Sequence, residues 1–166
     1  MMRAEVTRLG IETDVKRSSG GIREIEFIAQ SLQLIHGGRM PALRLQSLLP
    51  TLQALMQAEV LSTQQAQRLS DHYRLLRRVE HGLQGMADRQ TQALPTEPLD
   101  KAKLALLVGY PSWESLNSDL VGARGEVDAV FSDLIADPND PSSDELVASR
   151  TRFSALNAET LMALGY

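Results

Sequence analysis

The 166-residue sequence contains no cysteine, and this absence removes several classes of chemistry. Disulfides, thiolate nucleophiles and cysteine-ligated metal sites are all excluded. Aromatic residues make up only 4% of the chain and no segment alternates between apolar and polar residues, so half-buried strands are not expected. The longest strongly apolar run, residues 104–110, is too short to span a bilayer. The three histidines lack metal-ligand spacing, so we expect this chain to supply no metal site.

The composition is that of a globular domain, with 43% hydrophobic and 23% charged residues. Basic residues are interspersed with acidic ones rather than gathered into a stripe, so a nucleic-acid partner is not expected. The first residues contain no apolar segment ahead of a cleavage site, which does not fit a secretion signal. We therefore expect a cytoplasmic protein without a membrane segment.

Apolar residues recur with a period near 3.6 along most of the chain, which predicts helices. We expect a short basic helix before residue 10 and further helices at about residues 21–36, 44–59, 62–86, 99–108 and 112–135. Ser62 and Gln65 have the spacing of a capping box at the start of the helix expected at residues 62–86. The residues expected to face inward are Ile22, Ile25, Ala29, Leu32, Ile35, Leu45, Leu48, Leu52, Leu55, Ala66, Leu69, Tyr73, Leu76, Val79, Leu83, Leu116, Leu120, Val127 and Phe131.

The order of these segments predicts an all-α fold, an antiparallel bundle of five to six helices joined by short turns. Residues 1–20 are expected to form an N-terminal helix and loop, and residues 21–135 the bundle itself. Residues 136–166 read as an acidic, proline- and serine-rich linker followed by the start of a further helix.

The segment KRSSGGIREIEF at residues 16–27 contains the elements of an anion site. Gly20 and Gly21 precede a helix start, where free backbone N–H groups attract anions. Lys16 lies beside this helix start and has the charge to bond a phosphate.

The same segment also fits an ordinary helix entry. Glu24 lies in the first turn, where a carboxylate interacts favourably with the helix dipole. Arg23 and Glu26 are three residues apart, and such a pair is worth only ~0.2–0.5 kcal/mol. From the residues alone, the helix entry is the favoured interpretation.

Arg74, Arg77 and Arg78 share one side of the long helix at residues 62–86. They are candidates for contact with a phosphate or with an acidic surface of a partner. A solvated helix face is the favoured interpretation.

Four motifs in a fixed order point to a known family. GGIREIEFIAQSLQLIHGGRMPALR, SLLPTL, HYRLLRRVEHGLQ and DRQTQALP closely resemble the bacterial bifunctional glutamine synthetase adenylyltransferase/adenylyl-removing enzymes. The resemblance covers about residues 2–135 and is to the helical part of the N-terminal, adenylyl-removing half. The related PII uridylyltransferases share a similar lysine-loop-Gly-Gly element.

The resemblance implies a catalytic domain ahead of this segment, where a Gly-Ser pair and an Asp-x-Asp motif hold Mg²⁺ and nucleotide. This chain has neither motif, so it resembles a fragment that is inactive alone. The intact enzyme is implied to remove AMP from a tyrosine of glutamine synthetase by phosphorolysis, yielding ADP. Its other half attaches AMP from ATP. The implied partners are glutamine synthetase, the PII signal protein and the rest of the same polypeptide.

The resemblance also implies roles for residues of the loop. Lys16 and Arg23 would contact phosphate, Gly20 and Gly21 would let the backbone approach it, and Glu24 would orient Arg23 or a water. Glu26 is a weaker candidate for the same cleft.

The loop departs from the family pattern at two positions, where Arg17 replaces an apolar residue and Ser18 replaces a glycine. A serine at a position that needs positive φ would be strained.

The alternative is a non-catalytic interaction module that relays binding of PII or glutamine synthetase. It would use Arg74, Arg77 and Arg78 together with the acidic tail.

Overall fold

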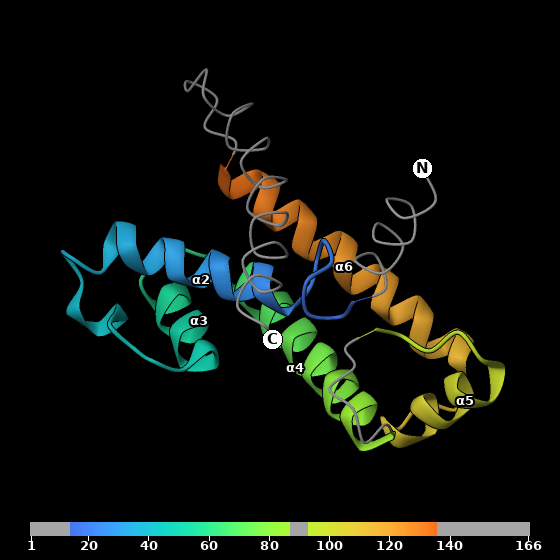
Figure 1. The fold of residues 1–166 in the computed structure, drawn as a ribbon. Helices are drawn as coiled ribbons and strands as arrows, with labels where there is room; N and C mark the ends of the chain where they lie inside the picture. The colour runs from blue at the N-terminus through green and yellow to red at the C-terminus, as the bar shows by residue number, and fades with distance from the viewer. Residues whose placement is uncertain (1–13, 87–92, 136–166) are drawn as a thin grey trace, which may run out of the picture. The chain divides into compact units, whose positions relative to one another are not determined.

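The structure is a computed structural model that describes residues 14–86 and 93–135 (Figure 1). Within these ranges it contains five α-helices and one short 3₁₀ helix, and no strand beyond an isolated bridge between Asp14 and Ala93. The elements are α2 (Ile22–His36), η1 (Pro41–Leu43), α3 (Leu48–Gln57), α4 (Thr63–Met86), α5 (Pro98–Leu107) and α6 (Trp113–Ile135). The all-α prediction is confirmed. The helix expected before residue 10 and the linker at 136–166 lie outside the described residues.

The first part of α3 differs from the prediction, which started this helix at residue 44. Pro41 begins η1 instead, and the backbone at Ser47 is still extended. Pro50 explains the later start, because proline is tolerated in the first turn of a helix but not in its interior. Leu45 therefore lies before the helix and is 40% exposed, so its predicted inward position was wrong.

The start of α4 follows the prediction. The Ser62 backbone N–H donates to Gln65 Oε1 at 2.9 Å, and the Gln65 N–H donates to Ser62 Oγ at 3.1 Å. This reciprocal capping box satisfies two N–H groups that the helix itself leaves without partners.

Part of the core lies where α2, α3 and α4 contact one another, and α5 packs against α4 (Figure 1). The buried residues Leu104 on α5 and Leu116 and Leu120 on α6 also belong to the core. The predicted inward residues Ile25, Leu52 and Leu76 are fully buried there. Ile35, also predicted inward, is 68% exposed, so its predicted inward position was wrong. Periodicity gives the direction of a side chain but not whether another element covers it.

The chain divides into two compact units, residues 1–130 and 131–166, and the boundary falls inside α6. Of the second unit the structure describes only the last residues of α6. In the first unit α6 contacts α4 through Glu126, whose Oε2 lies 2.7 Å from His72 Nε2 and 3.6 Å from Arg68 Nε. Among the described helices, none combines the length and apolar character needed to cross a membrane.

Two glycines in α6 give a prediction about stability. A Cβ added at Gly122 or Gly125 would meet nothing within 4 Å. Glycine in a helix interior costs about 0.8–1.0 kcal/mol relative to alanine. Gly122→Ala and Gly125→Ala should therefore each raise the free energy of unfolding by about 0.5–1 kcal/mol in urea denaturation.

Gly82→Ala is the matched control for the two α6 substitutions. Its Cβ would lie 2.9 Å from Leu104 Cδ1, so steric strain should cancel the helical gain. Equal stabilisation by all three substitutions would contradict this account.

Candidate functional site

The loop before α2 is held in shape by its own hydrogen bonds. The carboxylate of Asp14 accepts the backbone N–H groups of Lys16 at 2.8 Å and Arg17 at 3.0 Å. The carbonyl of Asp14 accepts the N–H of Ser18 at 3.0 Å. An aspartate that bonds the backbone two and three residues ahead forms a compact turn, so the loop is ordered without any ligand.

The first N–H groups of α2 already have partners inside the protein. Ile22 donates to the carbonyl of Val15 at 3.3 Å, and Arg23 donates to the carbonyl of Lys16 at 3.1 Å. The sequence-based expectation of free N–H groups at this helix start was therefore wrong. An anion at this loop would depend on side-chain cations rather than on the helix terminus.

Both glycines of the loop are explained by close packing. Gly20 has φ +71°, and a Cβ there would lie 2.4 Å from the Cα of Arg124 on α6. A Cβ on Gly21 would lie 2.7 Å from the carbonyl oxygen of Ser18. The N–H of Gly20 donates to Glu24 Oε2 at 2.7 Å, so Glu24 holds the loop against its own helix.

Ser18, one of the two departures from the family pattern, is accommodated without backbone strain. Among the described non-glycine residues only Glu59 has positive φ. Ser18 is 4% exposed and lies inside the loop. The doubt about its conformation is thus resolved in favour of a normal backbone.

Five side chains form a charged group behind this loop, which we call the Glu80 cluster: Lys16, Glu26, Tyr73, Arg77 and Glu80. Glu80 lies on α4 and is only 2% exposed. Its Oε2 accepts a hydrogen bond from Arg77 Nη1 at 2.7 Å, and its Oε1 lies 3.6 Å from Lys16 Nζ. The Glu80 cluster thus joins the loop to α4.

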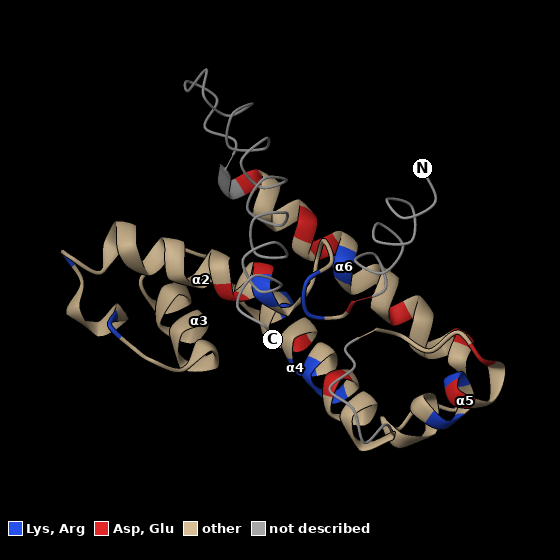
Figure 2. Ribbon diagram, viewed as in Figure 1, with Lys and Arg blue, Asp and Glu red and all other residues tan. Residues whose placement is uncertain are grey.

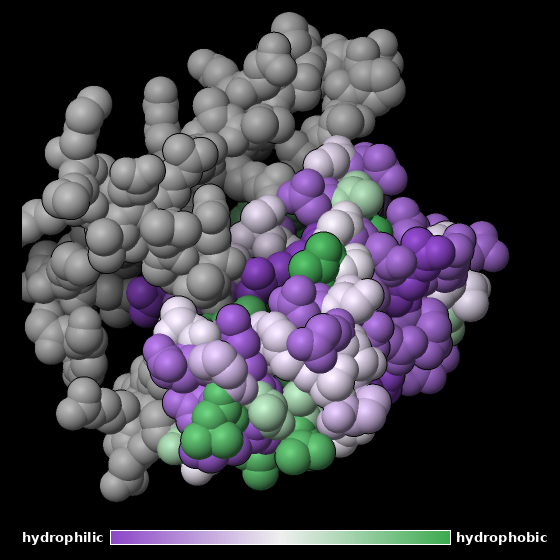
Figure 3. All heavy atoms as spheres, turned by 90° about the vertical axis from the view of Figure 1, so that its right-hand side faces the viewer, coloured by the Kyte–Doolittle hydropathy of each residue, from purple (hydrophilic) through white to green (hydrophobic). Residues whose placement is uncertain are grey.

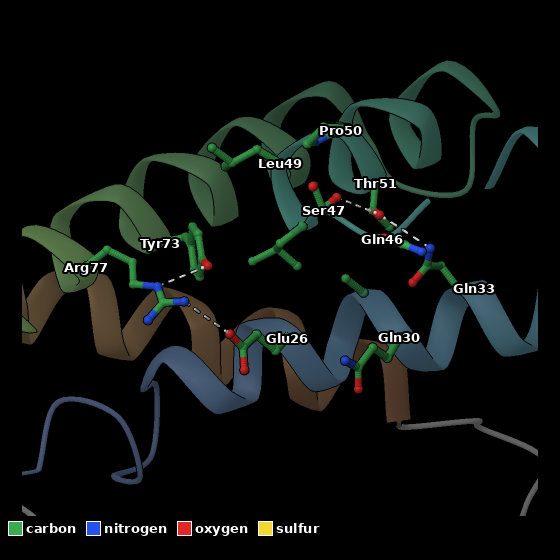
Figure 4. A pocket seen from close by; sticks show the side chains of 12 residues that line it. Glu26, Gln30, Gln33, Gln46, Ser47, Leu49, Pro50, Thr51, Tyr73 and Arg77 are labelled. Carbon is green, nitrogen blue, oxygen red and sulfur yellow. Dashed lines mark hydrogen bonds and ion pairs between the residues drawn. The ribbon is translucent and has the colours of Figure 1, made fainter. Parts of the chain in front are cut away.

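Arg77 connects the Glu80 cluster to α2. Its Nη2 lies 4.0 Å from Glu26 Oε1, and its Nε donates to Tyr73 Oη at 3.0 Å (Figure 4). Hydrogen bonds to Glu80 and then to Tyr73 raise the pKa of the Arg77 guanidinium above its ordinary value. The Arg77 guanidinium therefore stays charged, and its N–H groups already have partners in Glu80 and Tyr73.

The three arginines predicted to share a basic side are separated in their contacts. Arg77 turns into the Glu80 cluster, whereas Arg74 is exposed and pairs with Asp71 at 3.1 Å. Arg78 is exposed. Figure 2 shows acidic and basic residues close together along α4, so the exposed charge on this helix is partly neutralised.

A pocket of about 420 Å³ opens between α2, the start of α3 and α4 (Figure 4). Gln33 fixes one wall, since its Nε2 donates to the carbonyls of Leu43 at 2.6 Å and Leu45 at 2.9 Å. The largest polar side chains that line it are Glu26, Gln30, Gln33, Gln46, Tyr73 and Arg77. The pocket and the Glu80 cluster thus share one wall.

The structure brings together three of the predicted site residues, Lys16, Glu26 and Arg77, and leaves Arg23 apart. Arg23 is exposed in the first turn of α2, and its side chain makes no hydrogen bond or ion pair with the described residues. Arg17 of the loop is exposed as well.

Sequence reasoning missed Glu80 as a site residue, although a signal was present. Residues 66, 69, 73, 76, 80 and 83 follow one another at alternating steps of three and four, so Glu80 lies in the inward stripe. A carboxylate at such a position needs charged partners, because an unpaired buried charge is strongly unfavourable.

The described residues do not form the Mg²⁺ site that the resemblance implies. In these ranges no three histidine, aspartate or glutamate side chains are placed to hold a metal ion. The two carboxylates of the Glu80 cluster are paired with Arg77 and Lys16.

Comparison with known proteins gives a consistent result. A family model described as GlnD PII-uridylyltransferase matches residues 2–135. A bifunctional glutamine synthetase adenylyltransferase/adenylyl-removing enzyme from Xanthomonas axonopodis pv. citri (strain 306) is 52% identical over 133 residues. A protein of the same name from Xanthomonas oryzae pv. oryzae (strain MAFF 311018) is 50% identical over 133 residues. In both cases the match spans 80% of this chain and 14% of the relative. The resemblance seen in the four motifs is confirmed.

Proposed function

The chain belongs to the GlnD PII-uridylyltransferase family, and on this premise we propose that it forms the helical part of an adenylyl-removing domain. The larger protein would be a bifunctional glutamine synthetase adenylyltransferase/adenylyl-removing enzyme. The observation that carries this proposal is the identity of 52% and 50% to two proteins of that name. Because the chain spans 14% of their length, the activity would belong to the larger protein.

In the proposed reaction an oxygen of inorganic phosphate attacks the phosphorus of AMP attached to a tyrosine of glutamine synthetase. The bond between that phosphorus and the tyrosine oxygen breaks, ADP forms, and the tyrosine oxygen takes up the proton that the attacking phosphate loses. Mg²⁺, held outside this chain, would neutralise phosphate charge. The opposite half would use ATP to attach AMP. PII would be a regulatory partner in the cytoplasm.

Within that enzyme the loop at residues 16–21 and the start of α2 would line the nucleotide cleft. Lys16 and Arg23 are the two cations proposed to contact phosphate. The preorganised loop supports this role, because its hydrogen bonds exist before ligand binding and cost nothing in ordering later. Gly20, Gly21 and Glu24 would keep the loop in shape.

Exposed leucines on α5 are compatible with packing against other parts of a larger protein. Leu99, Leu106 and Leu107 are 66%, 69% and 62% exposed. Figure 3 shows the side of the molecule on which α5 lies in Figure 1, with apolar residues gathered along one edge among polar ones. Apolar side chains left uncovered are typical of contact surfaces.

The alternative of a relay module for PII or glutamine synthetase has less support. It relied on Arg74, Arg77 and Arg78 acting together, and Arg77 is occupied by Glu80 and Tyr73. Arg78→Glu in the full-length protein would test it, since loss of PII binding with normal phosphorolysis would favour the relay.

The cleft-lining role is tested by Arg23→Ala in the full-length protein. Loss of a charge-assisted bond to phosphate, about 1.5–3 kcal/mol, should slow ADP release from adenylylated glutamine synthetase at least about tenfold. Arg39→Ala, at the exposed turn after α2, is the control and should leave the rate unchanged. Normal turnover in Arg23→Ala would show that Arg23 does not contact the substrate.

A further inference from the structure

We propose that Glu80 is a positioning residue, which holds the ammonium group of Lys16 in the position from which Lys16 is proposed to contact phosphate. The inference deepens the proposed function and rests on the role of Lys16 in it. According to this inference, a residue of α4, which lies far along the chain from the loop, also orients a side chain of the proposed site.

The burial of Glu80 is the first step of the argument. A carboxylate that is 2% exposed occupies a position in the inward stripe of α4, between Leu76 and Leu83. An apolar residue of similar volume at such a position is often as stable as a buried ion pair, or more stable. Stability alone therefore does not explain the carboxylate, and its contacts are the better guide to its role.

The two oxygens of Glu80 are used differently. Arg77 takes Oε2 at 2.7 Å, which is a short, charge-assisted hydrogen bond. Arg77 is held in turn by Tyr73, so the carboxylate plane has a fixed orientation. Oε1 is left facing Lys16 Nζ at 3.6 Å. Arg77 thus orients the carboxylate of Glu80, and Glu80 in turn orients the ammonium group of Lys16.

The contact between Glu80 and Lys16 restrains the lysine side chain but leaves N–H donors of its ammonium group available for a ligand. At 3.6 Å it is an ion pair longer than a hydrogen bond, and the Lys16 side chain keeps 29% of its surface exposed. An ammonium group has three N–H donors, so it can face a phosphate while it stays near Glu80. Without Glu80 the flexible four-carbon side chain would sample many rotamers.

Glu80 can affect phosphate binding in two ways that have opposite signs, which makes the inference testable. The negative charge of Glu80 weakens the attraction of Lys16 for phosphate, so Glu80 would raise the KM for phosphate if it acted only as a counter-ion. A positioning residue lowers that KM by ordering the lysine in advance. Removing the charge of Glu80 separates the two.

The experiment uses Glu80→Gln in the full-length protein, with phosphorolysis measured against phosphate concentration. We expect the KM for phosphate to rise about five- to tenfold while kcat changes less than about twofold, because the lost contact restrains binding alike in the ground and transition states. Lys16→Met should raise the same KM, and Lys16→Met/Glu80→Gln should raise it no further than Lys16→Met alone. A lowered KM in Glu80→Gln, or independent effects in the double variant, would overturn the inference.

A second measurement does not depend on activity. In the 166-residue chain, NMR of the lysine ε-methylene groups should show the Lys16 signals shifting when Glu80 is replaced by glutamine. The signals of Lys103, which is paired with Asp100 at 3.2 Å, should stay in place as the control. Unchanged Lys16 signals in Glu80→Gln would overturn the inference. Absence of phosphorolysis in the wild-type protein would instead refute the proposed function.

Discussion

Replacing Arg77 by methionine is expected to lower the free energy of unfolding by about 3 kcal/mol. The substitution keeps most of the aliphatic volume, and Arg77 itself is 38% exposed, so lost packing contributes little. The cost comes from Glu80, whose buried carboxylate would lose its 2.7 Å hydrogen bond and keep only Lys16 at 3.6 Å. A buried charge left without its main partner is among the most destabilising changes a fold meets.

A double variant tests that explanation. In Arg77→Met/Glu80→Gln the buried group is neutral, so the loss should be at least about 1 kcal/mol smaller than the sum of the two single losses in urea denaturation. Arg74→Met is the matched control on the same helix. Its pair with Asp71 is exposed on both sides, so it should change stability by less than about 0.5 kcal/mol. Equal losses for Arg74→Met and Arg77→Met would contradict the account.

The helices of this protein were largely predictable because their signals are local. The 3.6-residue period gave α2 and α4, and the capping box at Ser62 and Gln65 marked the start of α4. The predicted start of α3 was wrong because the apolar period at residues 44–48 is weak, and Pro50 places the first turn of the helix later. One proline outweighs several residues of helical pattern, since it excludes a whole turn from the possible helix.

The candidate site was predictable only in parts. Lys16, Glu26 and Arg77 were each identified from the sequence, but for different roles, Lys16 and Glu26 in a cleft and Arg77 on a partner surface. Glu80 contacts Lys16 and Arg77, and Arg77 in turn contacts Glu26. This arrangement depends on how the loop packs across α4, because Glu80 follows Lys16 by 64 residues. Spacing rules cover neighbours on one helix and contain no information on such a contact.

The helix start shows a second limit of local reasoning. Helix N-termini have free N–H groups as a general rule, and no residue near Gly21 indicates that α2 is an exception. The loop folds back so that the carbonyls of Val15 and Lys16 satisfy Ile22 and Arg23. That return depends on the turn at Asp14 and on a glycine with positive φ, so it emerges only from the three-dimensional structure.

Gly20→Ala should be about as destabilising as Arg77→Met, with a loss of about 3 kcal/mol. Alanine at φ +71° costs roughly 1–2 kcal/mol in backbone strain. Its Cβ would also lie 2.4 Å from the Cα and 2.5 Å from the carbonyl oxygen of Arg124. Both atoms belong to the backbone of α6, so no side-chain rotation relieves the overlap, and the loop has to move away from the helix.

Movement of the loop connects this substitution to the site. Lifting Gly20 from α6 would break its 2.7 Å bond to Glu24 and displace Lys16 from Glu80. Gly38→Ala is the control, because a Cβ there meets nothing within 4 Å and stability should change by less than about 0.5 kcal/mol. If Gly20→Ala unfolds in urea like Gly38→Ala, the loop does not pack on α6 as described. Since Gly20 would then be free of α6, its proposed role in backbone approach to phosphate would become the better explanation for this glycine.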